Sequence, residues 1–192
     1  MYNPYARKSL KEERYFTYIY CFTKLLNNLP KENRNILFLG LGGGSIAKHL
    51  TENGFNVELC ELDKRIEYVA RNYFELPKSV NVTIDDARHF IEGSTKKYDA
   101  IIFDTFKGEE TPNHILTIES LEEVKKILSP DGYLLVNSFN YINGEKGLGL
   151  RSVYKTLNVS GFKTSIWGTD ESINNRNLLF ISSFTDHPQY KG

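Results

Sequence analysis

The chain has 192 residues, enough for one domain or for one domain with an arm, since a domain typically takes about 100–200 residues. Hydrophobic residues make up 40% of the chain and charged residues 25%, which are ordinary values for a globular protein. The 24 basic and 24 acidic residues cancel, which argues against a large nucleic-acid footprint, an acidic tail or a disordered activator.

Short apolar runs alternate with helical patterns along the chain, which is typical of a parallel sheet covered by helices. Apolar periodicity predicts helices over residues 8–28, 45–53, 64–74, 87–92, 118–128 and a last one ending near 157. Strand-like runs occupy residues 35–39, 56–61, 80–84, 99–103, 133–136, 163–167 and 177–182. Polar residues 169–176 join the last two runs, so we expect antiparallel neighbours there. Ser-Pro-Asp-Gly at 129–132 predicts a turn, and the glycines at 144, 147 and 149 predict a loop.

Signals for disulfides, membranes and metals are weak. Cys21 and Cys60 are the two cysteines and neither lies in a C-x-x-C motif. The first residues lack an apolar stretch behind their charge, and no apolar run approaches the roughly 18 residues of a membrane span. The four histidines are scattered without zinc-site spacing. We therefore expect a cytoplasmic protein with no membrane segment and no metal site.

A glycine-rich turn, Gly40-Leu-Gly-Gly-Gly-Ser45, follows the first predicted strand and opens a helix. Glycines let the backbone turn sharply and approach a ligand, and the helix adds free N–H groups with a positive dipole end. Glu61 closes the second strand, where its carboxylate can accept hydrogen bonds from both ribose hydroxyls of a nucleoside or nucleotide. Each feature alone has an ordinary structural explanation, but their combination in one βαβ unit predicts a nucleoside site.

Two details narrow the kind of nucleoside. The dinucleotide fingerprint G-x-G-x-x-G takes glycine or alanine at its sixth position, where this chain has Ser45. No Gly-Lys-Ser/Thr follows the glycines, which excludes a P-loop. A nicotinamide or flavin site is therefore disfavoured.

Two more acidic residues follow the third and fourth predicted strands. Asp86 precedes a short helix, so the role of N-cap explains it equally well. Asp104 ends a wholly apolar strand and precedes a polar loop. Ligands of doubly wound sheets bind at the carboxyl ends of the strands, near the point where the strand order reverses. We therefore expect both aspartates to line one rim with the glycine turn and Glu61.

Five segments carry a further signal through their order and spacing: I-L-F-L-G-L-G-G-G-S (36–45), C-E-L-D (60–63), I-D-D-A (84–87), Y-D-A-I-I-F-D-T (98–105) and L-S-P-D-G-Y-L-L-V-N (128–137). Together they resemble the spermidine synthase-like branch of the AdoMet-dependent methyltransferase superfamily. The resemblance implies a doubly wound, three-layer αβα fold of the α/β class. Its seven-stranded sheet would be mostly parallel with an antiparallel last strand. A helical arm (1–30), an AdoMet-binding Rossmann-like domain (31–185) and a tail (186–192) are expected.

The resemblance also implies how the cofactor, S-adenosyl-L-methionine or its decarboxylated form, would be held. The glycines would surround the sulfonium, Glu61 would bind the ribose, and Asp86 would accept from the adenine amino group. The expected cofactor contacts are Gly40, Leu41, Gly42, Gly43, Gly44, Glu61, Leu62, Asp86, Ala87, Asp104 and Thr105.

The resemblance implies fewer residues for the binding of the acceptor substrate. Asp104 matches the aspartate that acts on the attacking amine, which makes it the expected catalytic residue. The expected substrate contacts are Tyr18, Phe106 and His114. Two alternatives stay open: the tyrosines of the first helix also fit an aromatic core stripe, and His114 also fits a surface histidine.

Departures from the aminopropyltransferase pattern favour a different reaction. Gly43 stands where those enzymes have an aspartate, and Lys107 stands where they have a second one. They also carry an N-terminal β-domain, where this chain has a helix-like arm. Decarboxylated AdoMet and putrescine are cations, so losing two negative charges and gaining a positive one disfavours them. The change at Gly43 also leaves room for the carboxylate of intact AdoMet.

Three functions follow from these observations. The favoured one is an AdoMet-dependent methyltransferase that acts on an amine, in a small molecule or a protein, by in-line attack on the sulfonium carbon. The second is a polyamine aminopropyltransferase with an unusual acceptor. The third is a non-catalytic nucleoside-binding module. A homodimer is possible, because the tyrosine-rich arm fits a second subunit as well as its own core.

Overall fold

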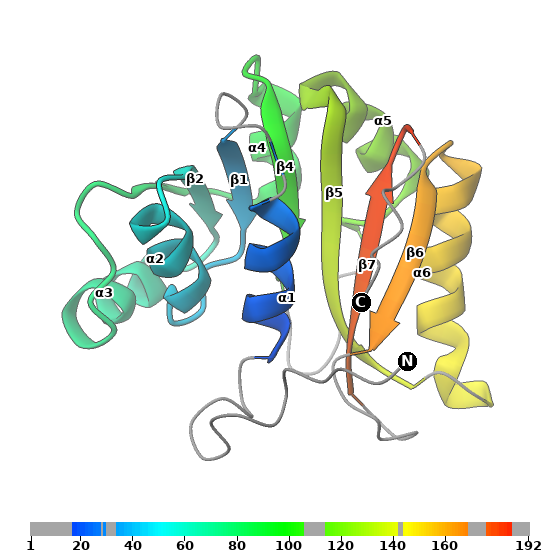
Figure 1. Ribbon diagram of the computed structural model, residues 1–192, viewed down its shortest axis with the longest axis horizontal. Helices are drawn as coiled ribbons and strands as arrows, with labels where there is room; N and C mark the ends of the chain where they lie inside the picture. Colours follow the sequence, from blue (N-terminus) through cyan, green and yellow to red (C-terminus); the bar gives the residue numbers. More distant parts are fainter. Residues whose placement is uncertain are drawn as a thin grey trace.

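The computed structural model describes residues 17–27, 29, 34–105, 114–141, 144–168 and 176–185. Within these ranges, seven strands form one sheet in the order β3-β2-β1-β4-β5-β7-β6 (Figure 1). The strands are β1 Asn35–Leu39, β2 Asn56–Glu61, β3 Asn81–Ile84, β4 Tyr98–Phe103, β5 Leu128–Asn140, β6 Lys163–Gly168 and β7 Arg176–Ser183. The helices are α1 Thr17–Leu26, α2 Ser45–Glu52, α3 Lys64–Tyr73, α4 Ala87–Gly93, α5 Ile118–Ile127 and α6 Leu148–Val159, with a short 3₁₀ turn, η3 Glu145–Gly147.

The strand directions confirm the predicted fold class. The pairs β3–β2, β2–β1, β1–β4 and β4–β5 are parallel, whereas β7 runs antiparallel to both β5 and β6. The strand order reverses between β1 and β4, because the chain moves outward from β1 to β3 and then returns to the other side of β1. That reversal is where ligands of doubly wound sheets bind.

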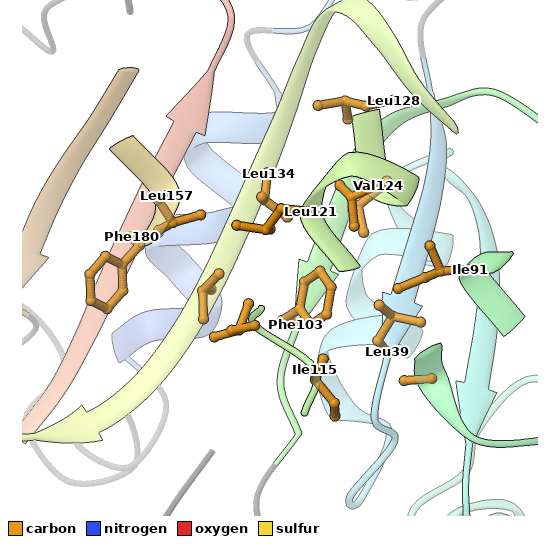
Figure 2. Packing of buried hydrophobic residues seen from close by; sticks show 14 of the residues in the cluster. Leu39, Ile91, Phe103, Ile115, Leu121, Val124, Leu128, Leu134, Leu157 and Phe180 are labelled. Atoms are coloured by element: carbon orange, nitrogen blue, oxygen red, sulfur yellow. The ribbon is translucent and has the colours of Figure 1, made fainter. Parts of the chain in front are cut away.

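Helices cover both faces of the sheet, and the strand side chains alternate between them. Leu37 and Leu39 of β1 point into a core cluster that contains residues of α4, α5 and α6, part of which is drawn in Figure 2. Ile36 and Phe38 point into a second cluster with residues of α1, α2 and α3. This alternation is the expected period of a strand buried on both faces, and it gives the three layers.

The described part of the N-terminal arm packs on its own domain. Phe22 and Leu26 of α1 are fully buried in the second core cluster. Residues 8–16 of the predicted first helix, and the predicted tail at 186–192, lie outside the described residues. None of the described helices is long and apolar enough to cross a membrane.

Two predictions about the second half of the chain were wrong. The turn expected at 129–132 lies inside β5, where it forms a bulge: pairing with β4 jumps from Tyr98–Leu128 to Ala100–Tyr133. Strand pairing on both sides of the insertion outweighs the local turn preference. Gly149, expected in a loop, lies in the first turn of α6, where a glycine costs little because the helix has barely begun.

Candidate functional site

The parallel registers bring the predicted site residues to one rim. Leu39 pairs with Cys60 on one side and with Phe103 on the other, so Gly40 lies between Glu61 and Asp104. The amide of Asp104 donates to the Leu39 carbonyl at 2.9 Å. The carboxyl ends of β1, β2 and β4 therefore meet at the reversal of strand order, as the sequence predicted.

The glycine turn owes its shape to three left-handed residues. Gly40, Gly42 and Gly44 have φ of 95°, 50° and 73°, which side-chain-bearing residues rarely adopt. Gly40 is also sterically required, because a Cβ there would lie 2.5 Å from the Asp104 carbonyl oxygen. This close approach brings the turn directly against the end of β4.

Gly43 differs from the other three glycines. Its φ lies outside the left-handed region, and an added Cβ would meet the Phe74 ring at 3.4 Å, an ordinary contact distance. Neither the backbone nor the packing requires a glycine at this position. Both the backbone and the packing at position 43 would therefore tolerate a side chain.

Glu61 fixes the turn as well as lining it. Its Oε2 accepts from the amide of Leu41 at 2.8 Å, and its Oε1 accepts from the amide of Asp63 at 2.9 Å. The hydrogen bond from the Leu41 amide joins the glycine turn to the end of β2, and the Leu41 side chain is buried. The sequence predicted an acidic residue at the rim but not this fastening.

An exposed apolar ledge adjoins Glu61. Leu62 is 70% exposed, and Ile84, which ends β3 opposite Glu61, is 42% exposed. Apolar side chains held out at a rim that also carries carboxylates fit the face of a planar base. Ala87 lies close by in the chain and is buried at the start of α4.

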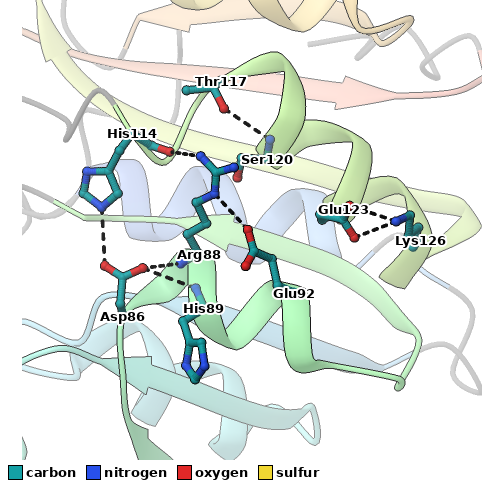
Figure 3. A network of polar contacts seen from close by, with 9 residues as sticks. All are labelled: Asp86, Arg88, His89, Glu92, His114, Thr117, Ser120, Glu123 and Lys126. Carbon is teal, nitrogen blue, oxygen red and sulfur yellow. Dashed lines mark hydrogen bonds and ion pairs between the residues drawn. The ribbon is translucent and has the colours of Figure 1, made fainter.

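Asp86 caps α4 and also faces His114 (Figure 3). Its Oδ1 accepts from the amides of Arg88 at 2.9 Å and His89 at 3.3 Å, and its Oδ2 lies 3.3 Å from Nε2 of His114. Burial opposes ionisation of Asp86, but the hydrogen bonds from His89, His114 and Arg88 outweigh it and lower its pKa. Both explanations considered from the sequence, cap and rim residue, apply to Asp86.

Asp104 is held by a residue that the sequence analysis did not select. Asn137 of β5 donates from Nδ2 to Asp104 Oδ1 at 2.8 Å. Burial raises the pKa of Asp104 to about 6, although the Asn137 hydrogen bond acts in the opposite direction. A carboxyl group with such a pKa can accept a proton near neutral pH.

Two buried polar atoms near Asp104 have no hydrogen-bond partner among the described residues. They are the hydroxyl of the adjoining Thr105 and Oδ1 of Asn137. Buried polar groups are nearly always paired in folded proteins, so unpaired ones beside a carboxylate mark a place for a polar ligand. One feature of the sequence could have pointed to Asn137: it follows the apolar run of β5, just as Asp104 follows the apolar run of β4.

The structure describes the remaining predicted site residues only in part. Tyr18 lies in α1, but its side chain is outside what the structure describes, as are Phe106 and Lys107. Among the described residues, His, Cys, Asp and Glu form no group of three or more that could hold a metal ion. Cys21 and Cys60 are both free.

A sequence model of the spermine/spermidine synthase domain matches residues 15–149. The chain belongs to this family. The match covers all the rim residues described above, from the glycine turn to Asn137. The predicted resemblance to the spermidine synthase-like branch is therefore confirmed.

Two of the relatives carry out different kinds of transfer. The chain is 37% identical to a polyamine aminopropyltransferase of Vibrio vulnificus over 66% of its own length and 44% of that protein. It is 32% identical to an N-terminal histidine N-methyltransferase of Emericella nidulans over 54% of its length and 19% of that protein. The chain thus spans less than half of either relative.

Solved structures show the same division. A probable spermidine synthase from Corynebacterium glutamicum superimposes with a TM-score of 0.78 at 22% identity, covering 92% of this chain and 67% of that one. Human methyltransferase-like protein 13 in complex with SAH superimposes with a TM-score of 0.68 at 23% identity, covering 88% and 77%. At these identities the structures show a shared fold.

Proposed function

We propose that the protein is an AdoMet-dependent transferase that moves a methyl group to an amine acceptor. The family, and a rim whose residues are suited to binding a nucleoside, support the transferase class. The observation that carries methyl transfer in particular is Gly43, the one glycine of the turn that the fold does not require.

A bare backbone at position 43 bears on the charge of the ligand. An aspartate there would place a negative charge beside the glycine turn and attract a cationic aminopropyl group. Without that side chain the turn is neutral and open, which suits the carboxylate of intact AdoMet. The backbone at position 43 would tolerate a side chain. The absence of a side chain there therefore supports intact AdoMet as the ligand.

Each rim residue has a defined task in this proposal. Glu61 would bind the ribose and keep the glycine turn in place, and Asp86 would bind the adenine. When bound, AdoMet supplies a carbon activated by its sulfonium group, so the protein needs to contribute orientation and a proton acceptor. Asp104, positioned by Asn137, would hold the attacking amine and accept its proton.

Aminopropyl transfer is the second candidate, and the comparisons support it about equally. The matching family model is that of spermine/spermidine synthases, and the Vibrio vulnificus relative is a polyamine aminopropyltransferase. Asp104 is compatible with a polyamine acceptor as well, because a carboxylate can accept a hydrogen bond from the amino group of a polyamine. The two candidates differ in the group carried by the sulfonium.

Calorimetric titration with AdoMet and with decarboxylated AdoMet separates them. We expect the wild-type chain to bind AdoMet more tightly. Gly43→Asp should shift the preference toward the decarboxylated form by about tenfold, as expected for one new charge pair in a partly exposed site. Gly43→Asn is the matched control, since it adds the same volume without the charge.

The possible outcomes point to different conclusions. A wild-type preference for decarboxylated AdoMet would replace methyl transfer by aminopropyl transfer. Binding of AdoMet without turnover over a panel of amines would favour a non-catalytic nucleoside-binding module. Failure to bind either compound would end the AdoMet proposal.

A further inference from the structure

His114 connects the segment that follows β4 to the start of α4. Its ring lies 3.3 Å from Asp86, and its carbonyl oxygen accepts from the Arg88 guanidinium at 3.5 Å (Figure 3). Arg88 is held in turn by an ion pair with Glu92 at 3.0 Å. Both contacts span more than 25 residues of sequence, so they join two elements that are separate in the chain.

The contact with His114 involves the one oxygen of Asp86 that can face a ligand. Oδ1 is occupied by the backbone amides of Arg88 and His89, as an N-cap requires. Oδ2 is the atom that approaches His114 Nε2. The Asp86 side chain is 39% exposed, so Oδ2 can still accept from a ligand. A carboxylate oxygen has room for two donors.

We infer that His114 is a specificity-determining residue for the adenine base, acting by holding Asp86 Oδ2 toward the base. This inference rests on the proposed function, in which Asp86 accepts from the adenine amino group. It moves His114 from the acceptor side, where the sequence analysis expected it, to the nucleoside side of the site.

The chemistry of the base explains the selectivity. Nε2 of His114 can satisfy the carboxylate only as a donor, so His114 and the base both donate to one oxygen. Adenine presents an amino group at its position 6 and can donate. Hypoxanthine presents a carbonyl oxygen there, which would face the Asp86 carboxylate without a hydrogen between them. A site with a fixed acceptor rejects a base that lacks the donor.

The test compares two nucleosides that lack the amino acid or aminopropyl group, so it does not depend on which group is transferred. 5′-Methylthioadenosine and 5′-methylthioinosine share the sugar and differ in the purine, one carrying the amino group and the other the oxygen. Their dissociation constants would be measured by calorimetry on the full chain, the wild type and three variants. The variants are His114→Ala, His114→Gln and His89→Ala.

We expect the wild type to bind the adenine nucleoside at least about tenfold more tightly than the hypoxanthine nucleoside. His114→Ala should weaken adenine binding about fivefold and reduce the preference. His114→Gln, which keeps a donor, should restore part of both. His89→Ala is the matched control, because its ring pairs with the neighbouring Asp85 at 2.7 Å and should affect neither constant.

Four results would count against the inference or its basis. Unchanged constants in His114→Ala would overturn the inference, and so would an equal weakening of both nucleosides, which indicates a merely structural role. If the wild type binds neither nucleoside, the proposed function itself fails. A rise in the KM for the acceptor with unchanged nucleoside binding would return His114 to the acceptor side and overturn the inference.

Discussion

The two ends of strand β4 carry an aspartate each, and their surroundings differ. Asp99, at the amino end, is 7% exposed and uses both carboxylate oxygens. Oδ2 accepts from the amide of Asn35 and Oδ1 from the hydroxyl of Ser129, both at 3.0 Å. Asp104, at the carboxyl end, receives one hydrogen bond among the described residues, from Asn137.

This difference distinguishes Asp99, whose carboxylate has a structural role, from Asp104, whose carboxylate we propose to be catalytic. The partners of Asp99 join β1 and the bulge of β5 to β4, so its role is complete within the fold. Asp104 has a raised pKa and lies beside two polar atoms that have no partner among the described residues, which supports a role in binding a ligand. This contrast supports the proposal that the rim with Asp104, and not the opposite edge of the sheet with Asp99, performs the chemistry.

The sharpest way to test this comparison is to neutralise each aspartate in turn. Asp104→Asn should reduce turnover about 10²–10⁴-fold, because the proton acceptor is lost, while nucleoside affinity stays within about twofold. Asp99→Asn should leave turnover near the wild-type value and lower the free energy of unfolding by about 1–3 kcal/mol, because an amide cannot accept both hydrogen bonds as a carboxylate does. Steady-state kinetics and chemical denaturation would measure the two effects. Equal activity loss in both variants would contradict the distinction.

Each aspartate also has a glycine packed against its backbone, and the two glycines should respond differently to alanine. At Gly40 the added Cβ would lie 2.5 Å from the Asp104 carbonyl oxygen, on a backbone with φ of 95°. At Gly132 it would lie 2.9 Å from Cδ1 of the flexible Leu128 side chain and 3.0 and 3.1 Å from the carbonyl oxygens of Ser129 and Asp99, without a left-handed φ. We expect Gly40→Ala to cost about 3 kcal/mol or more and Gly132→Ala clearly less. Denaturation midpoints would show the order, and the reverse order would refute it.

The smallest predicted effect concerns the donors to the two aspartates. Because the pKa of Asp104 is about 6, kcat/KM should fall as the pH drops through 6 and the carboxyl group takes up a proton. The Asn137 donor lowers this pKa, so Asn137→Leu should raise it and move the acidic limb to higher pH. The loss at pH 6 would be about threefold. Ser129→Ala, which removes a donor from Asp99, should leave the pH profile unchanged. A limb that stays in place in Asn137→Leu would exclude this role.

Local signals were sufficient to predict the elements and most of the rim. β1 and β2 have the predicted bounds, since apolar runs that end at a glycine or an acidic residue leave little freedom. The parallel registers then place Gly40, Glu61 and Asp104 together without further information. The bulge at 129–132 could not be predicted, because it depends on pairing with β4 and not on the four residues themselves.

The side-chain partners of the rim were beyond the sequence because they are non-local. Asn137 lies 33 residues from Asp104, and His114 lies 28 from Asp86. Neither pair belongs to a recognisable spacing, and each depends on how adjacent strands and helices pack. The fastening of Leu41 by Glu61 is of the same kind. Sequence reasoning selected Glu61 and His114 but not their contacts with Leu41 and Asp86, and it did not select Asn137.

The position of β7 has a consequence for how the chain is made. β7 lies between β5 and β6 and pairs with both, yet it is the last of the described strands in the sequence. During synthesis, β5 and β6 therefore leave the ribosome before β7, residues 176–183, and their edges toward β7 stay unpaired until that strand has been made. A chain released before that point would expose the free edge of β5, whose other edge pairs with β4, and the unpaired strand β6. Open strand edges are templates for aggregation. The half of the sheet with the glycine turn has no such delay, because β1 to β4 pair in the order in which they emerge.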